Sequence, residues 1–380
     1  MDEQRNQRPI VLERAEVLHA WWRLRRLKGV GNIALNDIRT HLSTPEDLLS
    51  CSRSDLIALG LSASKADEYL LSSGMISQDD DFNSVLQWSS MPGQGVLLAG
   101  TGDYPEALSS LRDAPIFLWY RGNTSALLQP MVAIVGSRGA TTAALNWAEE
   151  TAATLAQAGV CVVSGLALGI DGAAHKGAVA HGRTVAVMGT GPDIIYPARH
   201  KKLAEDITRQ GLLVTEFSPG TRAQARHFPS RNRIISGLSC ATVVVEAGLR
   251  SGTMITARMA ADQGRDVMAL PGSPANTLSR GPHQLIREGA VLVEHAGHIL
   301  EALNFAAQPV LPGFAETVTQ EAEPSAETPE LLHFVDFTPT PMDVIAIRSA
   351  RAIQELLPEL LQLELDGWLQ QAPGGYCRQR

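Results

Sequence analysis

The sequence has 380 residues, of which 44% are hydrophobic and 19% charged, and its formal net charge at pH 7 is −8. This composition is typical of a soluble globular protein with two or three domains. No apolar run is long enough to span a bilayer, and Met1 to Arg8 leads into no signal-peptide core. These features exclude an integral membrane protein and predict a cytoplasmic location.

The cysteines are scattered and form no C-x-x-C pair, so we expect reduced thiols, no metal site and no cofactor. The acidic net charge argues at first against a nucleic-acid partner. Its distribution along the chain matters more than its sum.

Residues 1–76 predict a helical accessory domain. The segment from Ala15 to about Ser73 has an apolar face and a basic face that includes Arg25. Gly29-Val-Gly31 resembles the turn of a helix-hairpin-helix (SAM-like) element, whose backbone N–H groups can hold a phosphate. An ordinary helix end at Gly29 is an equal alternative. Residues 59–62 predict a degenerate second hairpin.

Residues 77–130 lose the helical periodicity and contain turn clusters, so we expect a connecting layer with one strand over 115–120. From residue 131 to about 305 strand-like and helix-like segments alternate, which predicts an α/β domain. Near-continuous apolar strands indicate burial on both faces, and we infer a Rossmann-like, doubly wound, mostly parallel sheet within a domain of residues 77–305. The expected strands are 132–135, 160–163, 185–188, 212–215, 242–245, 267–270 and 291–293.

The turn between Ser164 and His175 is rich in glycine and leads from a strand into a helix, whose N-terminus favours a phosphate or another anion. It matches neither G-x-G-x-x-G nor a P-loop. Alternatively, the glycines only make a tight connection. Asp171 and His175 lie one helical turn apart, and we interpret them as a capping carboxylate and a buried histidine rather than a catalytic pair.

The loop from Arg222 to Arg233 combines four arginines with Phe228, a pattern that suits a single nucleic-acid strand, because guanidinium groups bind phosphates and an aromatic ring stacks on an unpaired base. Alternatively, Arg231 and Arg233 pair with Glu246 or Asp171 and Phe228 is core, and we expect internal pairing for one of these arginines. At the same sheet edge, Gly136-Ser-Arg138 and Ser251-Gly-Thr253 follow other strands and offer further anion-suited turns.

Residues 306–336 are rich in proline and glutamate without lysine or arginine, which predicts an acidic linker. Residues 337–380 predict two helices, 342–349 and 352–364, and a hairpin, as in a winged helix. The second helix is acidic and apolar, which favours a protein contact or a simple core over binding of duplex DNA.

These motifs together resemble the DNA-processing protein A (DprA, or Smf) family. The resemblance covers the α/β domain and rests on Val132-Ala-Ile-Val-Gly-Ser-Arg138, Ser164-Gly-Leu-Ala-x-Gly-Ile-Asp171 with His175, Phe228-Pro-x-Arg-Asn-Arg-Ile-Ile235, Glu246 with Ser251-Gly-Thr253, Pro271-Gly272, Tyr104-Pro105 and Tyr196-Pro197.

The resemblance implies a non-enzymatic homodimer that binds single-stranded DNA and loads the RecA recombinase during natural transformation. Where relatives often carry a lysine, residues 222–226 offer only Arg222 and Arg226. The expected DNA-binding residues are Gly136, Ser137, Arg138, Ser164, Gly165, Leu166, Gly169, Arg226, Phe228, Arg231, Arg233, Ser251, Gly252 and Thr253.

Two other functions remain compatible with the residues. One is a phosphoribohydrolase-like Rossmann enzyme that cleaves an N-glycosidic bond with Glu246 and Arg250, although the P-G-G-x-G-T run of that class is missing. The other is a regulator that binds a small nucleotide, which requires a deep pocket over one turn.

Overall fold

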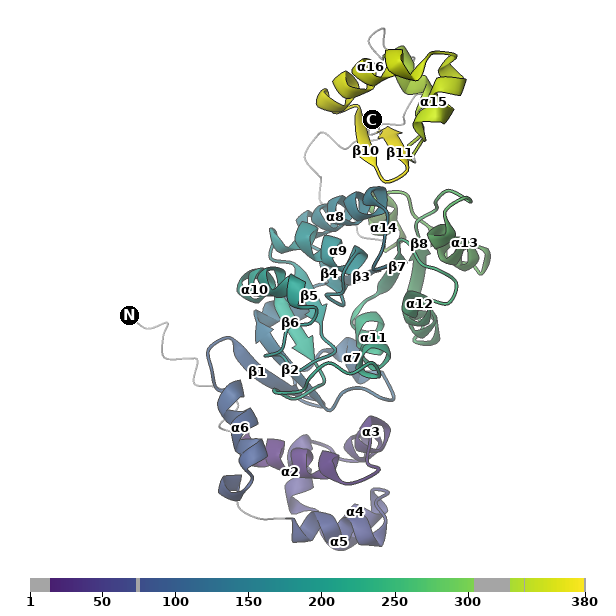
Figure 1. Ribbon diagram of the computed structural model, residues 1–380. Helices are drawn as coiled ribbons and strands as arrows, with labels where there is room; N and C mark the ends of the chain where they lie inside the picture. The colour runs from purple at the N-terminus through teal and green to yellow at the C-terminus, as the bar shows by residue number, and fades with distance from the viewer. Residues whose placement is uncertain (1–13, 73–75, 304–328, 338, 379–380) are drawn as a thin grey trace. The chain divides into compact units, whose positions relative to one another are not determined.

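The computed structural model describes residues 14–72, 76–303, 329–337 and 339–378. The chain forms two compact units, Met1–Gln308 and Pro309–Arg380, shown as ribbons in Figure 1. No helix in these described ranges combines the length and the hydropathy needed to cross a membrane.

The described part of the first unit is built on a nine-stranded sheet in the order β1-β2-β6-β5-β4-β3-β7-β8-β9. Neighbouring strands from β3 to β9 pair in parallel, whereas β1 and β2 add an antiparallel edge. This confirms the predicted doubly wound, mostly parallel sheet. The strands are β1 (Gln94–Leu98), β2 (Phe117–Gly122), β3 (Met131–Val135), β4 (Cys161–Ser164), β5 (Thr184–Val187), β6 (Leu212–Thr215), β7 (Ala241–Val244), β8 (Asp266–Ala269) and β9 (Val291–Leu292).

Successive residues of each strand pack into cores on opposite faces of the sheet, as the twofold period of a strand requires. Val132 and Ile134 of β3 pack on one face with α8 (Thr142–Gln157), α9 (Ile170–Val179) and α14 (Ala296–Ala302). Ala133 and Val135 pack on the other face with α11 (His227–Leu238), α12 (Gly252–Asp262) and α13 (Arg280–Arg287). Helices therefore cover both faces and leave the carboxyl ends of the strands accessible.

The N-terminal helices share the core of the second face. They are α2 (Ala15–Arg26), α3 (Asn32–Thr40), α4 (Arg53–Ala58) and α5 (Ala63–Leu71). Trp22 lies 6.4 Å from the ring of Phe117 and 6.5 Å from that of Trp119 in β2, measured between ring centroids. Glycines with positive φ, Gly29 at 76° and Gly60 at 100°, lie in the turns between these helices, a conformation that suits both the predicted hairpins and an ordinary helix end.

The expected loss of helical structure after residue 77 is wrong at its start, because α6 (Asp80–Ser89) is a helix. Asp79 caps it by accepting a hydrogen bond from Phe82 N, and Phe82, Val85 and Ser89 face the core. The prediction missed this short amphipathic pattern because the turn clusters of residues 91–105 follow it closely. The strand expected over 115–120 is present as β2, and β1 pairs with it.

The second unit contains η6 (Glu330–Phe334), α15 (Met342–Ser349), α16 (Ile353–Leu365) and the hairpin of β10 (Leu369–Ala372) and β11 (Gly375–Arg378). The expected helices and hairpin of a winged helix are all present. The predicted linker extends too far: Leu331, Leu332 and Val335 are buried in the core of this unit, because apolar residues end the acidic run. Residues 306–328 of that linker lie outside the described residues.

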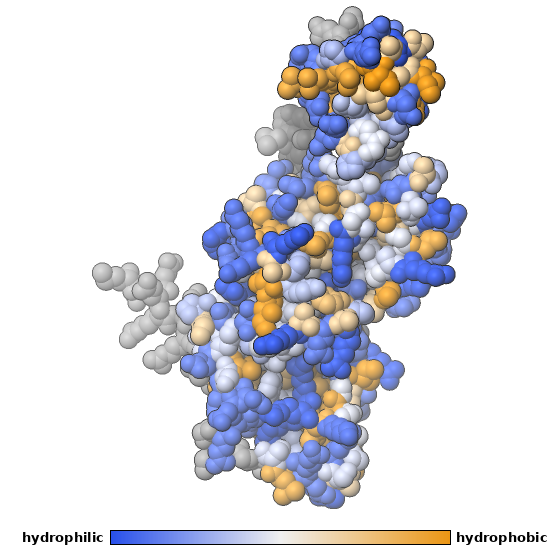
Figure 2. Space-filling model, viewed as in Figure 1, coloured by the Kyte–Doolittle hydropathy of each residue, from blue (hydrophilic) through white to orange (hydrophobic). Residues whose placement is uncertain are grey.

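Helix α16 is apolar on two adjoining faces. Leu356, Leu360 and Leu363 are buried, whereas a row at four-residue spacing is exposed. Figure 2 shows hydrophobic side chains at the surface of this unit. The exposed row is Ile353, Leu357, Leu361 and Leu365. An acidic helix with an aliphatic surface is unsuited to a phosphate backbone.

Candidate nucleic-acid interface

Three of the predicted turns meet at the carboxyl edge of the sheet. Ser137 N donates to Glu246 O at 2.6 Å, and Ile170 N donates to Ser137 O at 3.2 Å. Thr253 Oγ1 donates to Gly136 O at 3.1 Å. The turns after β3, β4 and β7 thus meet at one edge, as expected, and are joined by hydrogen bonds. The amide of Ser137 is used in this way and is not available to an anion.

Gly169 and Gly136 are explained by close packing of the chain. Gly169 has φ +77° and lies so near the turn after β3 that a Cβ would stand 2.8 Å from the Cα of Arg138. A Cβ at Gly136 would stand 2.5 Å from Ile170 Cγ1. For Gly169 the tight-connection interpretation is sufficient, and close packing accounts for Gly136 as well.

The turn between β4 and α9 satisfies much of its own polarity. Asp171 is buried, and its Oδ2 accepts hydrogen bonds from Gly165 N at 3.1 Å and Ala167 N at 3.4 Å. Burial raises the pKa of Asp171, and the positive charge of Arg231 opposes this shift. The carboxylate therefore holds the loop that precedes α9, and these two amides point inward rather than to a ligand. The capping interpretation is wrong for Asp171, because the N-cap of α9 is Gly169 and has no side-chain cap bond.

His175 is also structural. Its ring is fully buried, with Nδ1 2.7 Å from the hydroxyl of Thr184, and Nε2 has no partner within the described ranges. Burial lowers the pKa of His175 to about 3, so the imidazole is neutral at pH 7. It cannot cycle as an acid and base near neutrality.

A group of aromatic and cationic side chains, from the exposed Arg138 and Tyr196 to the half-buried Phe228, lies over the ends of β3, β4 and β5. The guanidinium carbon of Arg138, which is exposed, is 5.9 Å from the centroid of the Phe228 ring. The ring of Tyr196 is 5.4 Å from that of Phe228 and is tilted by 42° to it. Arg138, Tyr196, Phe228 and Arg231 line one small pocket, with Gly165 among its walls.

Arg231 forms the cationic wall of this pocket. It is only 5% exposed, its Nη1 donates to Val187 O at 2.7 Å, and its guanidinium lies directly against Gly165. Burial lowers its pKa to about 10, with Asp171 opposing the shift, so the group stays charged at neutral pH. Gly165 is needed here because any side chain would occupy the space of the guanidinium.

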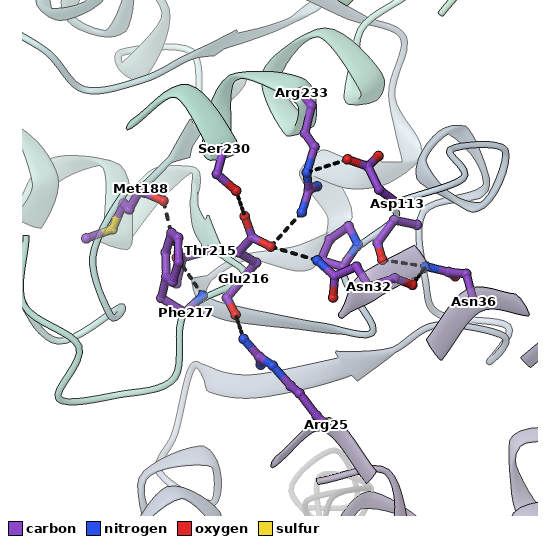
Figure 3. A network of polar contacts seen from close by, with 12 residues as sticks. Arg25, Asn32, Asn36, Asp113, Met188, Thr215, Glu216, Phe217, Ser230 and Arg233 are labelled. Atoms are coloured by element: carbon purple, nitrogen blue, oxygen red, sulfur yellow. Dashed lines mark hydrogen bonds and ion pairs between the residues drawn. The ribbon is translucent and has the colours of Figure 1, made fainter. Parts of the chain in front are cut away.

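The structure does not bring Arg233 to this edge. Its Nη2 is 2.5 Å from Glu216 Oε2 and its Nε is 3.1 Å from Asp113 Oδ2, as drawn in Figure 3. Residues two apart on a helix do not share a face, so Arg231 and Arg233 of α11 cannot both point to the pocket. Internal pairing therefore holds for Arg233, although with partners other than the expected Glu246 or Asp171.

Two further predicted contacts are buried. Ser164 is 0% exposed and its hydroxyl donates to Ile134 O at 2.7 Å. Leu166 is 0% exposed and packs in the core, although its φ is +58°. Neither side chain can reach a ligand, because both are fully buried. These residues of the turn serve its own folding.

The remaining predicted residues lie at the rim. Arg226 is exposed and donates from Nε to Gln224 Oε1 at 3.0 Å. Ser251 is at the N-cap position of α12 but makes no side-chain cap bond, and Gly252 is exposed. Thr253 ties its turn to Gly136 instead of capping the helix.

Tyr196 was not among the predicted contacts. The available signal was its position after the strand now seen as β5, at the same edge as Arg138 and Phe228. A half-exposed aromatic residue there is a candidate for stacking on a base, since it is 50% exposed beside the Phe228 ring.

The two alternative functions find little support at this edge. Glu246 accepts hydrogen bonds from Thr141 N at 2.9 Å, Thr141 Oγ1 at 3.0 Å and Asn276 Nδ2 at 2.7 Å, so its carboxylate is engaged in holding turns together. The pocket has a volume of about 60 Å³, far below the roughly 300–1,000 Å³ of small-molecule sites. No group of His, Cys, Asp and Glu suited to a metal ion occurs in the part of the chain that the structure describes.

The fold and this edge define a doubly wound α/β protein with a cationic and aromatic surface at its strand ends, joined to a winged-helix unit. The chain belongs to the DNA recombination-mediator protein A family, whose model matches residues 95–304. The model of the DprA winged helix domain matches residues 315–375.

Relatives agree with this assignment. The chain is 43% identical over 301 residues to protein Smf of Escherichia coli K12, which covers 78% of this chain and 80% of that protein. It resembles the X-ray structure of DNA processing protein A from Streptococcus pneumoniae with a TM-score of 0.64 and 35% identity, over 74% of this chain and 95% of the other. It also resembles DNA processing protein A of Helicobacter pylori, whose structure concerns its single-stranded DNA binding mode, with a TM-score of 0.52 and 29% identity over 56% and 96% of the two chains.

Proposed function

We propose that this recombination-mediator protein binds single-stranded DNA, without sequence preference and without catalysis, at the pocket edge formed by Arg138, Tyr196, Phe228 and Arg231. The observation that carries the proposal is the exposed Arg138 guanidinium over the Phe228 ring, with the buried charge of Arg231 in the same pocket. The single-stranded DNA binding of the Helicobacter pylori relative supports it.

The chemistry of the edge suits a single strand better than a duplex. Guanidinium groups bind phosphate oxygens of any sequence, and each aromatic ring can stack on a base at a gain of about 1–3 kcal/mol. A base in a duplex is already stacked on both sides and is not available to Phe228. The preference for single strands therefore follows from the aromatic residues, and the affinity from the cations.

The test is a salt titration of binding to labelled single-stranded and duplex oligonucleotides. Arg138→Ala removes one phosphate contact, so the slope of log K against log salt becomes shallower by about 0.7. Phe228→Ala weakens binding without changing the slope. Arg258→Ala is the matched control, because it removes an equal charge from an exposed position of α12. Absence of single-strand binding, or binding unchanged in Arg138→Ala and Phe228→Ala, contradicts the proposal.

We also propose that the protein acts as a homodimer and delivers bound strands to the RecA recombinase in natural transformation. The family assignment supports this role. The outer edge strand β9 supports self-association, because Val291 and Leu292 are each 44% exposed there. An unpaired apolar edge is a ready surface for pairing with a second chain.

Two measurements check these steps. Sedimentation velocity of the full chain and of Leu292→Lys tests the dimer, which the substitution should weaken. RecA-dependent ATP hydrolysis on strands coated with single-strand-binding protein tests loading. Loading should increase with the wild type and fail with Arg138→Ala, and a wild type without effect on RecA contradicts this role.

A further inference from the structure

Glu216, the residue that follows β6, lies at the centre of a buried polar network (Figure 3). Its side chain is only 6% exposed, and it accepts hydrogen bonds from both the α/β domain and the N-terminal helices. The DNA contacts proposed above do not involve it, because its carboxylate is directed toward Arg233 and not toward the pocket.

Helix α11 contributes two donors to this carboxylate. Ser230 Oγ is 2.9 Å from Glu216 Oε1, and Arg233 Nη2 is 2.5 Å from Oε2. The next residue, Phe217, stacks on the ring of His227 with centroids 4.0 Å apart. Residues 216 and 217 thus hold the first two turns of α11 from one side.

The opposite side of the same turns carries the proposed DNA contacts. Phe228 and Arg231 are three residues apart and share one face of α11, whereas Ser230 and Arg233 share another. A rotation or tilt of α11 that follows the loss of its contacts with Glu216 would therefore move Phe228 and Arg231 together.

The N-terminal helices complete the network. Asn32 Nδ2, at the start of α3, donates to Glu216 Oε2 at 3.0 Å, and Arg25 Nη2 of α2 donates to the backbone oxygen of Glu216 at 3.1 Å. One carboxylate therefore joins α2 and α3 to the helix that carries Phe228 and Arg231.

We propose that Glu216 is a positioning residue through which the N-terminal helices set the affinity of the DNA site without touching DNA. The inference rests on the proposed function. Buried ion pairs add little net stability but penalise alternative arrangements, because separating them leaves a buried charge without compensation. The network thus keeps α11 in one orientation and prepares Phe228 and Arg231 for binding.

The test measures the affinity of the full chain for labelled oligothymidylate and the dependence of that affinity on salt. It compares the wild type with two variants of the network and two control variants. Asn32→Ala removes one donor from the N-terminal side and leaves the pair of Glu216 and Arg233 intact. Its control is Asn83→Ala, since Asn83 lies in α6, a helix that gives Glu216 none of the hydrogen bonds described above. Glu216→Gln removes the charge at nearly constant shape, and Glu205→Gln removes an equal charge from an exposed position of α10 (Lys201–Gln210).

Both substitutions in the network should lower the affinity about two- to tenfold, because coupled groups of one network interact strongly. The salt slope should remain unchanged, because no phosphate contact is lost. If charge alone mattered, Glu216→Gln would raise the affinity for DNA, since the negative charge that it removes repels DNA. The two control variants should bind as tightly as the wild type or slightly more tightly.

Wild-type affinity in folded Asn32→Ala and Glu216→Gln overturns the positioning role and leaves the proposed function standing. A shallower salt slope also overturns it, because that result indicates direct phosphate contact. A wild type that binds no single strand removes both proposals. If Glu216→Gln does not fold, Asn32→Ala decides, together with amide exchange of residues 227–238, which should become faster in that variant.

Discussion

Replacing Gly165 by alanine tests whether the proposed site depends on the exact placement of Arg231. A Cβ at residue 165 would overlap the Arg231 guanidinium, whose atoms are the three nearest to it, and the backbone of Gly165 is not in the left-handed region, so a methyl group acts first on Arg231. To make room, the guanidinium must retreat from Val187 O, to which it donates at 2.7 Å.

The size of the effect follows from that hydrogen bond. A bond from a charged donor contributes about 1.5–3 kcal/mol, and Gly165→Ala should lower the free energy of unfolding by about this amount. For the unit Met1–Gln308 the loss corresponds to a decrease in Tm of roughly 2–5 °C. The displaced charge should also weaken binding of single-stranded DNA.

The assay combines thermal unfolding with the oligonucleotide titration. Gly139→Ala is the matched control, because it is the same substitution in an exposed turn at the same edge, and a Cβ there meets no atom within 4 Å. It should change the unfolding free energy by less than about 0.5 kcal/mol. If Gly165→Ala has the Tm and the affinity of Gly139→Ala, the assigned role of Arg231 is refuted.

Three further outcomes are expected. Tyr196→Ala should weaken binding of single strands while Tyr196→Phe retains it, since stacking on a base needs the ring alone, and equal titration curves for the two would contradict stacking. The pKa of His175 is held at about 3, so the unfolded chain takes up a proton that the folded chain excludes, and the unfolding free energy should fall by about 1.4 kcal/mol per pH unit as pH decreases from about 6.5. Denaturant unfolding at pH 7 and pH 5 measures this slope, which His175→Asn should flatten. Glu246→Gln should destabilise the fold by about 1.5–3 kcal/mol through its lost charged hydrogen bonds and leave single-strand affinity unchanged in the folded protein, whereas lower affinity without destabilisation would place Glu246 in the DNA site.

Local patterns were sufficient for most of the fold. Each expected strand from 132–135 to 291–293 is present within one residue at either end, because short apolar runs between glycine-rich turns have few other ways to be buried. Helix α6 was not predicted, because its amphipathic pattern is only ten residues long. The end of the acidic linker was misplaced because the charge run conceals the apolar residues that follow it.

For the candidate site, the sequence selected the residue types, whereas the tertiary structure decided which of them reach the pocket. Residue types and their positions after strands were enough to select Arg138, Phe228 and Arg231 and to propose an anion-binding edge, because parallel strands all end on one side of a sheet. The sequence also led us to expect internal pairing for one of Arg231 and Arg233. Their spacing on a helix was not predicted, because residues 222–233 were expected to form a loop, whereas α11 begins at His227. Which of the two faces the pocket depends on the position of Glu216, 17 residues before Arg233. Only the packing of α11 between the pocket and the N-terminal helices decides this, since a local pattern contains no information about which buried carboxylate a distant arginine will meet.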